Sequence, residues 1–407
     1  MSARANRIVL SHGLTGFICW YAVEKVFQKT IGITTLGVSI LAVSYIVVSA
    51  LANIPTGVMA DKFGRKYAIT FATVALLGST LVAAVAQNYW YYMISVMLWG
   101  LFYSTQNGAY EATLYDTLKE ENKQEQYARY SGLLSAVFWV SIFVASIIGA
   151  WVGGHYGLRV AYWITVVPNI FNIALALSLH EPSVYQTSEK TRPLAMAKQG
   201  YRFITSSQQV LNIAAVYLML AIIGWTTNEF GQLYFIEIGF AVFLVGVSNA
   251  FSGLFQSIGN FVGHRFGTVS KKVIVVTMLL LMTATFLVPL RLRYLGLALF
   301  FVLVMLRQIF TISNSAELQH LIPSKIRATT LSSLGMINDG ILIIVYLSFG
   351  YLSQYRNIRS GYLLVVAYAA LLVIAVRLYA RSKSGQNLPL SQEVLPGDLP
   401  EIDSMPR

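Results

Sequence analysis

Charged side chains inside long apolar stretches are the first candidates for chemistry in this sequence. Arg307 and Asp339 each lie well within stretches that are otherwise mostly apolar. A charge inside a bilayer is costly, so an ionisable residue there marks an ion or substrate site by default. At about 1.5 Å of rise per residue, the two residues reach similar depths on consecutive predicted helices. We predict that they form an ion pair near the membrane midplane; the alternative is that Arg307 faces water and Asp339 bonds elsewhere.

Glu111 belongs to a polar stripe on another predicted helix. The members of the stripe recur every three or four residues, which places them on one helical face; they are Gly100, Ser104, Asn107, Glu111 and Tyr115. We predict that Glu111 carries a proton or contacts substrate. The alternative is a carboxylate near the helix end that bonds to loop groups. Asp116 lies closer to that end, and we predict that it pairs with Arg65.

Aromatic and amide residues on other predicted helices extend the candidate proton and substrate site. These residues are Trp20, Tyr21, Asn228 and Asn314. Glu24 has Lys25 beside it and lies in the outer third of its helix, so we expect an interfacial residue rather than a proton carrier. Glu229 lies near the outer end of its helix, where a solvated carboxylate is ordinary.

The composition is that of an integral membrane protein. Of the 407 residues, 56% are hydrophobic and 11% are charged, whereas a soluble domain carries about 25% charged residues. The net charge of +12 would suggest nucleic-acid binding in a soluble protein. Here the basic residues lie mostly in loops and ends on one side, so we expect a lipid bilayer and no nucleic acid as partner.

We predict an all-α membrane protein with twelve transmembrane helices, each of about 20 residues or more. Their approximate ranges are 8–28, 36–60, 67–86, 90–118, 127–153, 160–180, 209–236, 240–263, 272–290, 294–321, 327–354 and 357–380. The longest connection, 181–208, separates a six-helix half at 1–180 from a second at 209–381. Residues 382–407 carry four prolines and few large apolar residues, which predicts a disordered tail.

The distribution of basic residues predicts the orientation. With both termini placed inside, basic residues on the inner side outnumber those on the outer side by about three to one. Inner loops carry such an excess in membrane proteins. We therefore predict a multi-pass protein of the plasma (inner) membrane with both termini in the cytoplasm.

A short charged connection joins the second and third predicted helices. It reads Gly57-Val58-Met59-Ala60-Asp61-Lys62-Phe63-Gly64-Arg65-Lys66. An excess of basic residues in inner loops explains Lys62, Arg65 and Lys66 but neither Asp61 nor the glycines. This stretch resembles the loop between helices two and three of the major facilitator superfamily of secondary transporters.

That resemblance implies two pseudo-symmetric six-helix halves and alternating access. It implies a set of gating residues at Gly57, Asp61, Gly64, Arg65, Lys66 and Asp116. It also implies that Asp61 caps the start of helix eleven, near Ile326, when the inner side is closed. A decayed copy of the loop runs from Gly263 to Gly267, followed by Lys271 and Lys272, and supports an internal repeat.

The favoured function is proton-coupled export of a small, largely apolar or cationic compound, as in bacterial drug exporters. The stretch from Gly149 to Gly154 partly resembles the antiporter motif of the family, with Ala150 in place of its proline. The alternative is import or facilitated diffusion of a metabolite, followed by a membrane sensor or enzyme. No phosphate-binding loop, paired-histidine motif or nucleophile elbow occurs, so we expect no catalytic residues, no cofactor and no metal.

Overall fold

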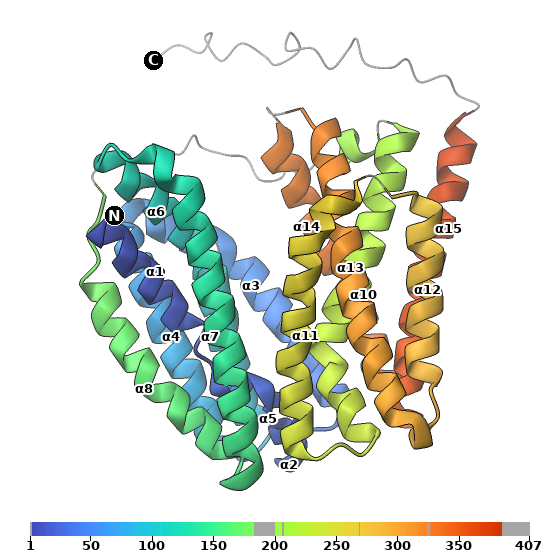
Figure 1. Cartoon of the computed structure of the whole chain (residues 1–407), viewed down its shortest axis with the longest axis horizontal. Helices are drawn as coiled ribbons and strands as arrows, with labels where there is room; N and C mark the ends of the chain where they lie inside the picture. The colour runs from blue at the N-terminus through green and yellow to red at the C-terminus, as the bar shows by residue number, and fades with distance from the viewer. Residues whose placement is uncertain are drawn as a thin grey trace.

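The computed structural model describes residues 2–106, 108–182, 200–205, 207–267, 269–323 and 326–384. Within these ranges the side chains of residues 61, 264, 328, 381, 383 and 384 are not described. The predicted tail beyond residue 384, most of the predicted linker and Asn107 therefore lie outside the described residues. The described part of the chain folds into α-helices and short 3-10 helices (Figure 1).

The helices before residue 183 form a first group. They are α1 (Ala3–Thr15), η1 (Cys19–Ala22), α2 (Glu24–Thr30), α3 (Thr35–Phe63), α4 (Arg65–Val85), α5 (Tyr89–Gln106), α6 (Ala109–Glu120), η2 (Gln124–Gln126), α7 (Tyr127–His155) and α8 (Leu158–Leu177). The helices after residue 207 form a second group. They are α10 (Gln208–Glu237), α11 (Val242–Gly263), η3 (His264–Phe266), α12 (Lys271–Leu287), η4 (Leu290–Leu292), α13 (Arg293–Leu321), α14 (Arg327–Tyr355) and α15 (Ile358–Ser384).

Nine helices in the described part of the chain are long and apolar enough to cross a membrane. These nine helices correspond to nine of the twelve predicted spans. The other three predicted spans do not contain a single helix that is long and apolar enough to cross a membrane; they are 8–28, 90–118 and 272–290. The third of these is α12, which has only 17 residues. The first two are interrupted, so the prediction of a continuous helix at 8–28 and at 90–118 was wrong.

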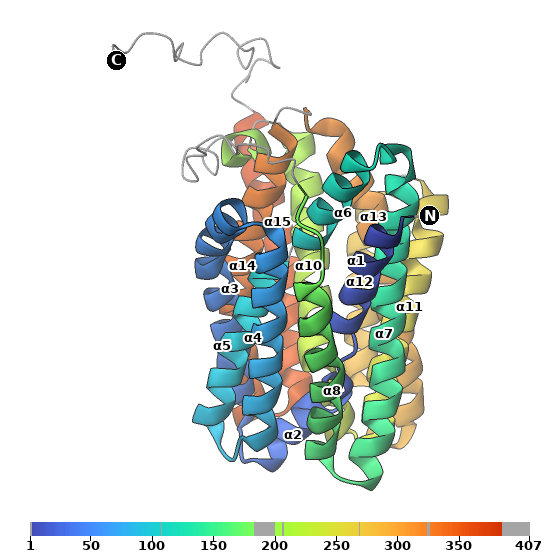
Figure 2. The ribbon, with the colours of Figure 1, turned by 90° about the vertical axis from the view of Figure 1, so that its left-hand side faces the viewer.

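The interruption in the first span lies between Thr15 and Glu24. The chain leaves the α-helix at Gly16, forms the 3-10 helix η1 and starts α2 at Glu24. The backbone N–H of Cys19 donates to Thr165 Oγ1 at 3.0 Å, so a hydroxyl from α8 holds this irregular backbone. Figure 2 shows α2 at the opposite end of the bundle from the N-terminus.

The fourth predicted span is interrupted after Gln106, where α5 ends, and α6 begins at Ala109. Gly108 has φ of +78°, a left-handed conformation that glycine adopts readily because it has no Cβ. Ser104 therefore belongs to α5 and Glu111 to α6. The polar stripe predicted along one continuous helix is divided between two helices, so its residues do not share a single helical face.

The two groups converge at the end of the bundle that carries α2 and are separated at the opposite end, which carries α6 (Figure 1). We call this opposite end the Gly64 end, because α3 begins five residues after α2 and runs for 29 residues to Gly64. At the α2 end, the backbone N–H of Thr35 on α3 donates to Gln354 Oε1 on α14 at 2.9 Å. Gly350 on α14 lies so close to Ser39 on α3 that an added Cβ would come within 2.3 Å of its hydroxyl oxygen. These contacts join α3 to α14 near the α2 end.

Small residues on α7 allow a second close contact between the groups, with α11, and a close contact within the first group, with η1. An added Cβ on Gly246 of α11 would lie 2.5 Å from Ala150 Cβ on α7. An added Cβ on Gly149 would lie 1.8 Å from the carbonyl oxygen of Cys19. The partial antiporter motif is thus the surface on which α7 packs against its two neighbours.

Replacing Gly149 with alanine should destabilise the protein, because the new methyl group meets backbone that cannot move away as a side chain would. Overpacking of this kind costs about 1–3 kcal/mol. Gly132 lies on the same helix with no atom within 4 Å of an added Cβ. We expect Gly149→Ala to lower the melting temperature of the purified protein and Gly132→Ala to keep it or raise it slightly, because alanine favours a helix more than glycine does; equal melting temperatures of the two variants would contradict the packing described here.

Candidate functional site

A cavity of about 270 Å³ lies between the two groups. Its walls come from η1, α2, α3, α4, α5, α10 and α14. Eight lining residues are aromatic, namely Trp20, Tyr21, Tyr45, Tyr92, Trp99, Tyr103, Trp225 and Tyr346. Four are charged, namely Glu24, Lys25, Glu229 and Asp339. Ligand sites are typically concave and mostly apolar with a few polar groups, and this cavity fits that description.

An ion cluster at the α2 end of the cavity links the two groups. The Lys25 ammonium lies 2.5 Å from Glu229 Oε1 on α10 and 3.2 Å from Glu24 Oε2 on α2. The side chains are 7%, 26% and 15% exposed for Lys25, Glu229 and Glu24 respectively. Glu229 is therefore not the freely solvated carboxylate that the sequence predicted, because both carboxylates share one largely buried cation; the predicted interfacial position of Glu24 stays a prediction.

Neutral polar groups hold the carboxylate of Glu24 in place. Gln28 Nε2 donates to Glu24 Oε1 at 2.8 Å, and the Tyr92 hydroxyl donates to the same oxygen at 3.3 Å. The Tyr92 and Tyr162 hydroxyls lie 3.1 Å apart. A buried charge needs such hydrogen bonds in addition to an opposite charge. Glu24 is thus fixed from both α2 and α5.

Gln232 on α10 adds two hydrogen bonds between the groups beside the ion cluster. Its Oε1 accepts from the backbone N–H of Lys25 at 3.1 Å, and its Nε2 donates to the carbonyl of Tyr21 at 2.8 Å. The irregular backbone between η1 and α2 supplies these groups. The interruption of the first span therefore exposes the backbone atoms that fasten α10 to the first group.

Trp20 and Tyr21 both line the cavity, and their predicted part in a substrate site stays a prediction. The Trp20 ring stacks on Tyr162 with centroids 5.4 Å apart, and its indole N–H donates to Thr80 Oγ1 at 3.3 Å. The indole is thereby fixed between α8 and α4. Asn314 lies elsewhere: it is buried, and its Nδ2 donates to the carbonyl of Ile213 at 3.1 Å, so it joins α13 to α10.

Arg307 and Asp339 do not form the predicted ion pair in this structure. Asp339 lines the cavity and accepts from Asn338 Nδ2 at 3.5 Å. Arg307 instead donates to Gln256 Oε1 at 2.9 Å and to Gln308 Oε1. Its guanidinium packs against Gly224, where an added Cβ would lie 2.5 Å from Nη1. The prediction was wrong because amide groups on α11 and α13, which equal depth alone does not reveal, accept from the arginine.

The charged loop at the other end of the bundle is closed by a carboxylate that the sequence pattern did not identify. Gly64 has φ of +102° and ends α3. Glu181, which follows α8, accepts from the backbone N–H groups of Arg65 and Lys66 at 2.8 and 2.7 Å. These N–H groups begin α4, and a negative charge at a helix N-terminus is favourable.

The predicted pairing of Arg65 with Asp116 is confirmed. A similar pair occurs in the second group, where Lys271 at the start of α12 pairs with Glu317 on α13. Lys271 follows the decayed copy of the charged loop, so the structure places comparable ion pairs after both loops.

The described structure does not test the roles predicted for three residues near this end. The Asp61 side chain lies outside the described residues, so its contact with helix eleven stays a prediction. Glu111 is exposed in the first turn of α6. Gly57 is exposed, and an added Cβ there would meet no atom within 4 Å. The roles predicted for these residues stay predictions.

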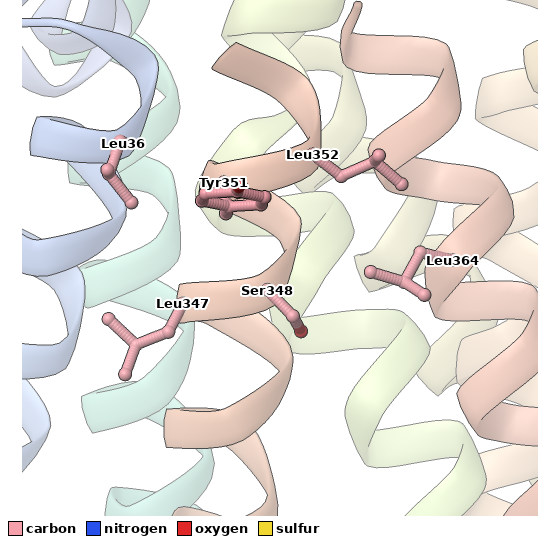
Figure 3. A pocket seen from close by; sticks show the side chains of 6 residues that line it. All are labelled: Leu36, Leu347, Ser348, Tyr351, Leu352 and Leu364. Carbon is pink, nitrogen blue, oxygen red and sulfur yellow. The ribbon is translucent and has the colours of Figure 1, made fainter. Parts of the chain in front are cut away.

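A second, larger hollow lies between α3, α14 and α15 (Figure 3). It is lined by Leu36, Leu347, Ser348, Tyr351, Leu352 and Leu364. No lining residue is charged, and the Ser348 hydroxyl donates to the carbonyl of Ile344 at 2.6 Å. An apolar groove of this kind suits a surface that faces lipid, and it offers no group for ion or substrate chemistry.

The long apolar helices and the polar cavity between them define a multi-pass membrane protein with the fold of a transporter. A sequence profile described as Major Facilitator Superfamily matches residues 8–339. The chain belongs to the major facilitator superfamily, and the relatives that it matches are membrane transporters rather than enzymes.

Individual relatives are distant. The chain is 20% identical over 163 residues to a probable 4-methylmuconolactone transporter from Cupriavidus pinatubonensis (strain JMP 134 / LMG 1197), a match that covers 40% of this chain and 38% of the relative. The crystal structure of the nucleoside transporter NupG has a TM-score of 0.73 at 12% identity and covers 93% of this chain and 99% of that one. A bacterial homologue of the human lysosomal transporter Spinster, in an inward-facing and unoccupied conformation, has a TM-score of 0.72 at 14% identity, covering 94% of this chain and 98% of that one.

Removing the cation of the ion cluster should destabilise the protein more than removing the cation together with a carboxylate. Lys25→Met leaves two partly buried carboxylates without a counter-ion, and removing one partner of a fully buried pair costs about 3–5 kcal/mol. Lys25→Met combined with Glu229→Gln leaves only one. We expect the double variant to have the higher melting temperature, with the exposed Lys272→Met as control; a double variant less stable than Lys25→Met would argue against a shared cation.

Glu181→Gln should loosen the charged loop, because the amide keeps one acceptor but loses the charge at the start of α4. A charge at a helix N-terminus contributes about 0.3–1 kcal/mol when exposed and up to about 2 when partly buried. We expect a fall of a few degrees in melting temperature for Glu181→Gln and none for the exposed Glu125→Gln. Matching melting temperatures in wild type and Glu181→Gln would leave the carboxylate without the role described.

Proposed function

We propose that this protein is a secondary transporter that works by alternating access, in a state open at the Gly64 end. The contacts between the groups described above lie from the α2 end to about the middle of the bundle, where Phe143 on α7 meets Phe251 on α11. The bias of basic residues supports a cytoplasmic location for the Gly64 end. The state is then inward-open, which agrees with the inward-facing conformation of the Spinster homologue.

The finer architecture in this proposal is two six-helix halves. The first half is residues 1–180 with α1, η1 and α2 acting together as one span and α5 with α6 as another; the second half is residues 209–381. The comparable ion pairs of Arg65 with Asp116 and Lys271 with Glu317 support a repeat. We propose the inner membrane as the location, with residues 181–208 as a cytoplasmic linker.

The proposal of proton coupling rests on the ion cluster of Glu24, Lys25 and Glu229. When all three groups are ionised, the two carboxylates and one ammonium give the cluster one more negative charge than positive. Protonation of Glu229 removes the attraction that holds α10 to Lys25. The α2 end can then open, so a proton taken up at this position favours the outward-open state. Glu111 remains a second candidate for a proton carrier.

The cavity supports an aromatic or apolar compound with positive charge as the substrate. Aromatic ring faces attract cations, and Asp339 and Glu229 add negative charge to the same walls. A cation and a proton would then compete for the same carboxylates. Competition of this kind gives exchange, which supports proton-driven export as the direction.

Import or facilitated diffusion of a metabolite is the second candidate. The nucleoside transporter NupG shares the fold, and the fold alone does not determine the direction of transport. In proton-coupled import the substrate and the proton would move in the same direction, whereas in proton-driven export they move in opposite directions.

Purified protein in proteoliposomes should move ethidium, a planar aromatic cation, against its gradient when a pH gradient is imposed. We expect wild-type flux to depend on the pH gradient and to fall by tenfold or more in Glu229→Gln, with Glu125→Gln as control. Flux that ignores the pH gradient would favour facilitated diffusion. Flux in the direction of proton movement would favour import by symport.

A further inference from the structure

Arg307 is a charged residue that the proposed transport mechanism does not use. It is the fifteenth residue of the 29 in α13, which places it halfway along the helix. Among the described ion pairs none includes Arg307. A lone cation at this depth is costly, and the amide oxygens of two glutamines compensate only part of that cost. The Nε atom is buried and has no partner in the described structure.

Two chains of hydrogen bonds lead away from the guanidinium. In the first, Arg307 donates to Gln256 Oε1, and Gln256 Nε2 donates to Asn228 Oδ1 at 3.1 Å. In the second, Arg307 donates to Gln308 Oε1, and Gln308 Nε2 donates to Asn260 Oδ1 at 2.5 Å. We call these five residues the Arg307 network.

The direction of both chains follows from the arginine itself. A guanidinium has five N–H donors and no acceptor, so each glutamine must turn its oxygen toward it. Each glutamine then presents its NH₂ group to the next residue, which must accept with its oxygen. Asn228 and Asn260 are therefore left with their NH₂ groups at the ends of the chains. Both asparagines are exposed.

The ends of the two chains lie close together and beside the cavity. Asn260 follows Gln256 by four residues on α11, which places the two on one helical face, and Asn228 bonds directly to Gln256. Asn228 also follows Trp225 by three residues on α10, and Trp225 lines the cavity. The network thus presents a charge of +1 and outward-facing N–H donors next to the aromatic walls.

We propose that the Arg307 network binds an anionic group, such as a carboxylate or a halide ion. The network combines the positive charge of Arg307 with the N–H donors of two exposed asparagines, and charged and N–H donor groups of this kind bind anions. The source of that anion is either the transported compound, which would then carry a carboxylate, or a free inorganic anion that accompanies the transport cycle. This site is separate from the carboxylates that bind protons.

Thermal unfolding of the full-length protein in detergent at low ionic strength tests the site without any transport. The probes are sodium benzoate, sodium chloride and the neutral benzamide. We expect saturating benzoate to raise the melting temperature by about 2 °C or more, as binding to the folded state does, and benzamide to leave it unchanged. If benzoate raises the melting temperature and chloride does not, the site binds a substrate carboxylate. If chloride raises the melting temperature as much as benzoate does, the site binds a free inorganic anion.

The variants make the result specific to the network. Arg307→Gln should lose the benzoate shift, whereas Arg291→Gln, which removes an exposed arginine of η4, should keep it. If Arg307→Gln does not fold, Asn228→Ala with Asn260→Ala should still reduce the shift at least twofold. An equal shift with benzamide, no shift with any anion, or a full shift in the variants of the network would overturn the proposal. None of these outcomes depends on whether ethidium is transported.

Discussion

The structure depends on one ammonium group placed between two carboxylates. Lys25 is held on the first group of helices by Glu24 and attracted to the second by Glu229. A buried pair contributes little net stability, because desolvation offsets the Coulomb attraction, but breaking it by removing one partner is strongly unfavourable. The cluster therefore adds little net stability as it stands, but the loss of one of its charges would weaken this link between the two groups, which Gln232 and Gln354 also join by hydrogen bonds.

Interruptions of the helices position this cluster. A continuous first span would leave no free backbone N–H at Lys25 and no free carbonyl at Tyr21 for Gln232. Irregular backbone at membrane depth is tolerated where it is buried in protein or lines a cavity. Gly149 on α7 allows that irregular backbone to approach. The glycine-rich stretch and the broken span are thus parts of the same arrangement.

The sequence predicted the helical membrane fold, the family and the pairing of Arg65 with Asp116, because apolar length and a loop of fixed spacing are local signals. It failed where partners are distant. Glu24 and Glu229 are 205 positions apart in the sequence. Taken alone, each is a carboxylate near the end of a predicted helix, where charged residues are common. The pairing predicted for Arg307 with Asp339 rested on equal depth, which says nothing of which way each side chain points around its helix. Glu181 gave no signal, because a single carboxylate after a helix has many possible partners.

The contact of Ala150 with Gly246 has a mechanical consequence. Because both residues are small, α7 and α11 approach each other closely there, and a rigid tilt of the two groups about this contact would have arms of unequal length. Gly263, at the far end of α11, lies roughly 26 Å from Gly246 at 1.5 Å per residue, so a tilt of about 10° displaces it by about 4–5 Å. The arm on the other side of this contact is only a few residues long. Such a tilt would therefore produce a wide movement at the Gly64 end and a small one at the α2 end, where the hydrogen bonds and the ion cluster between the two groups lie.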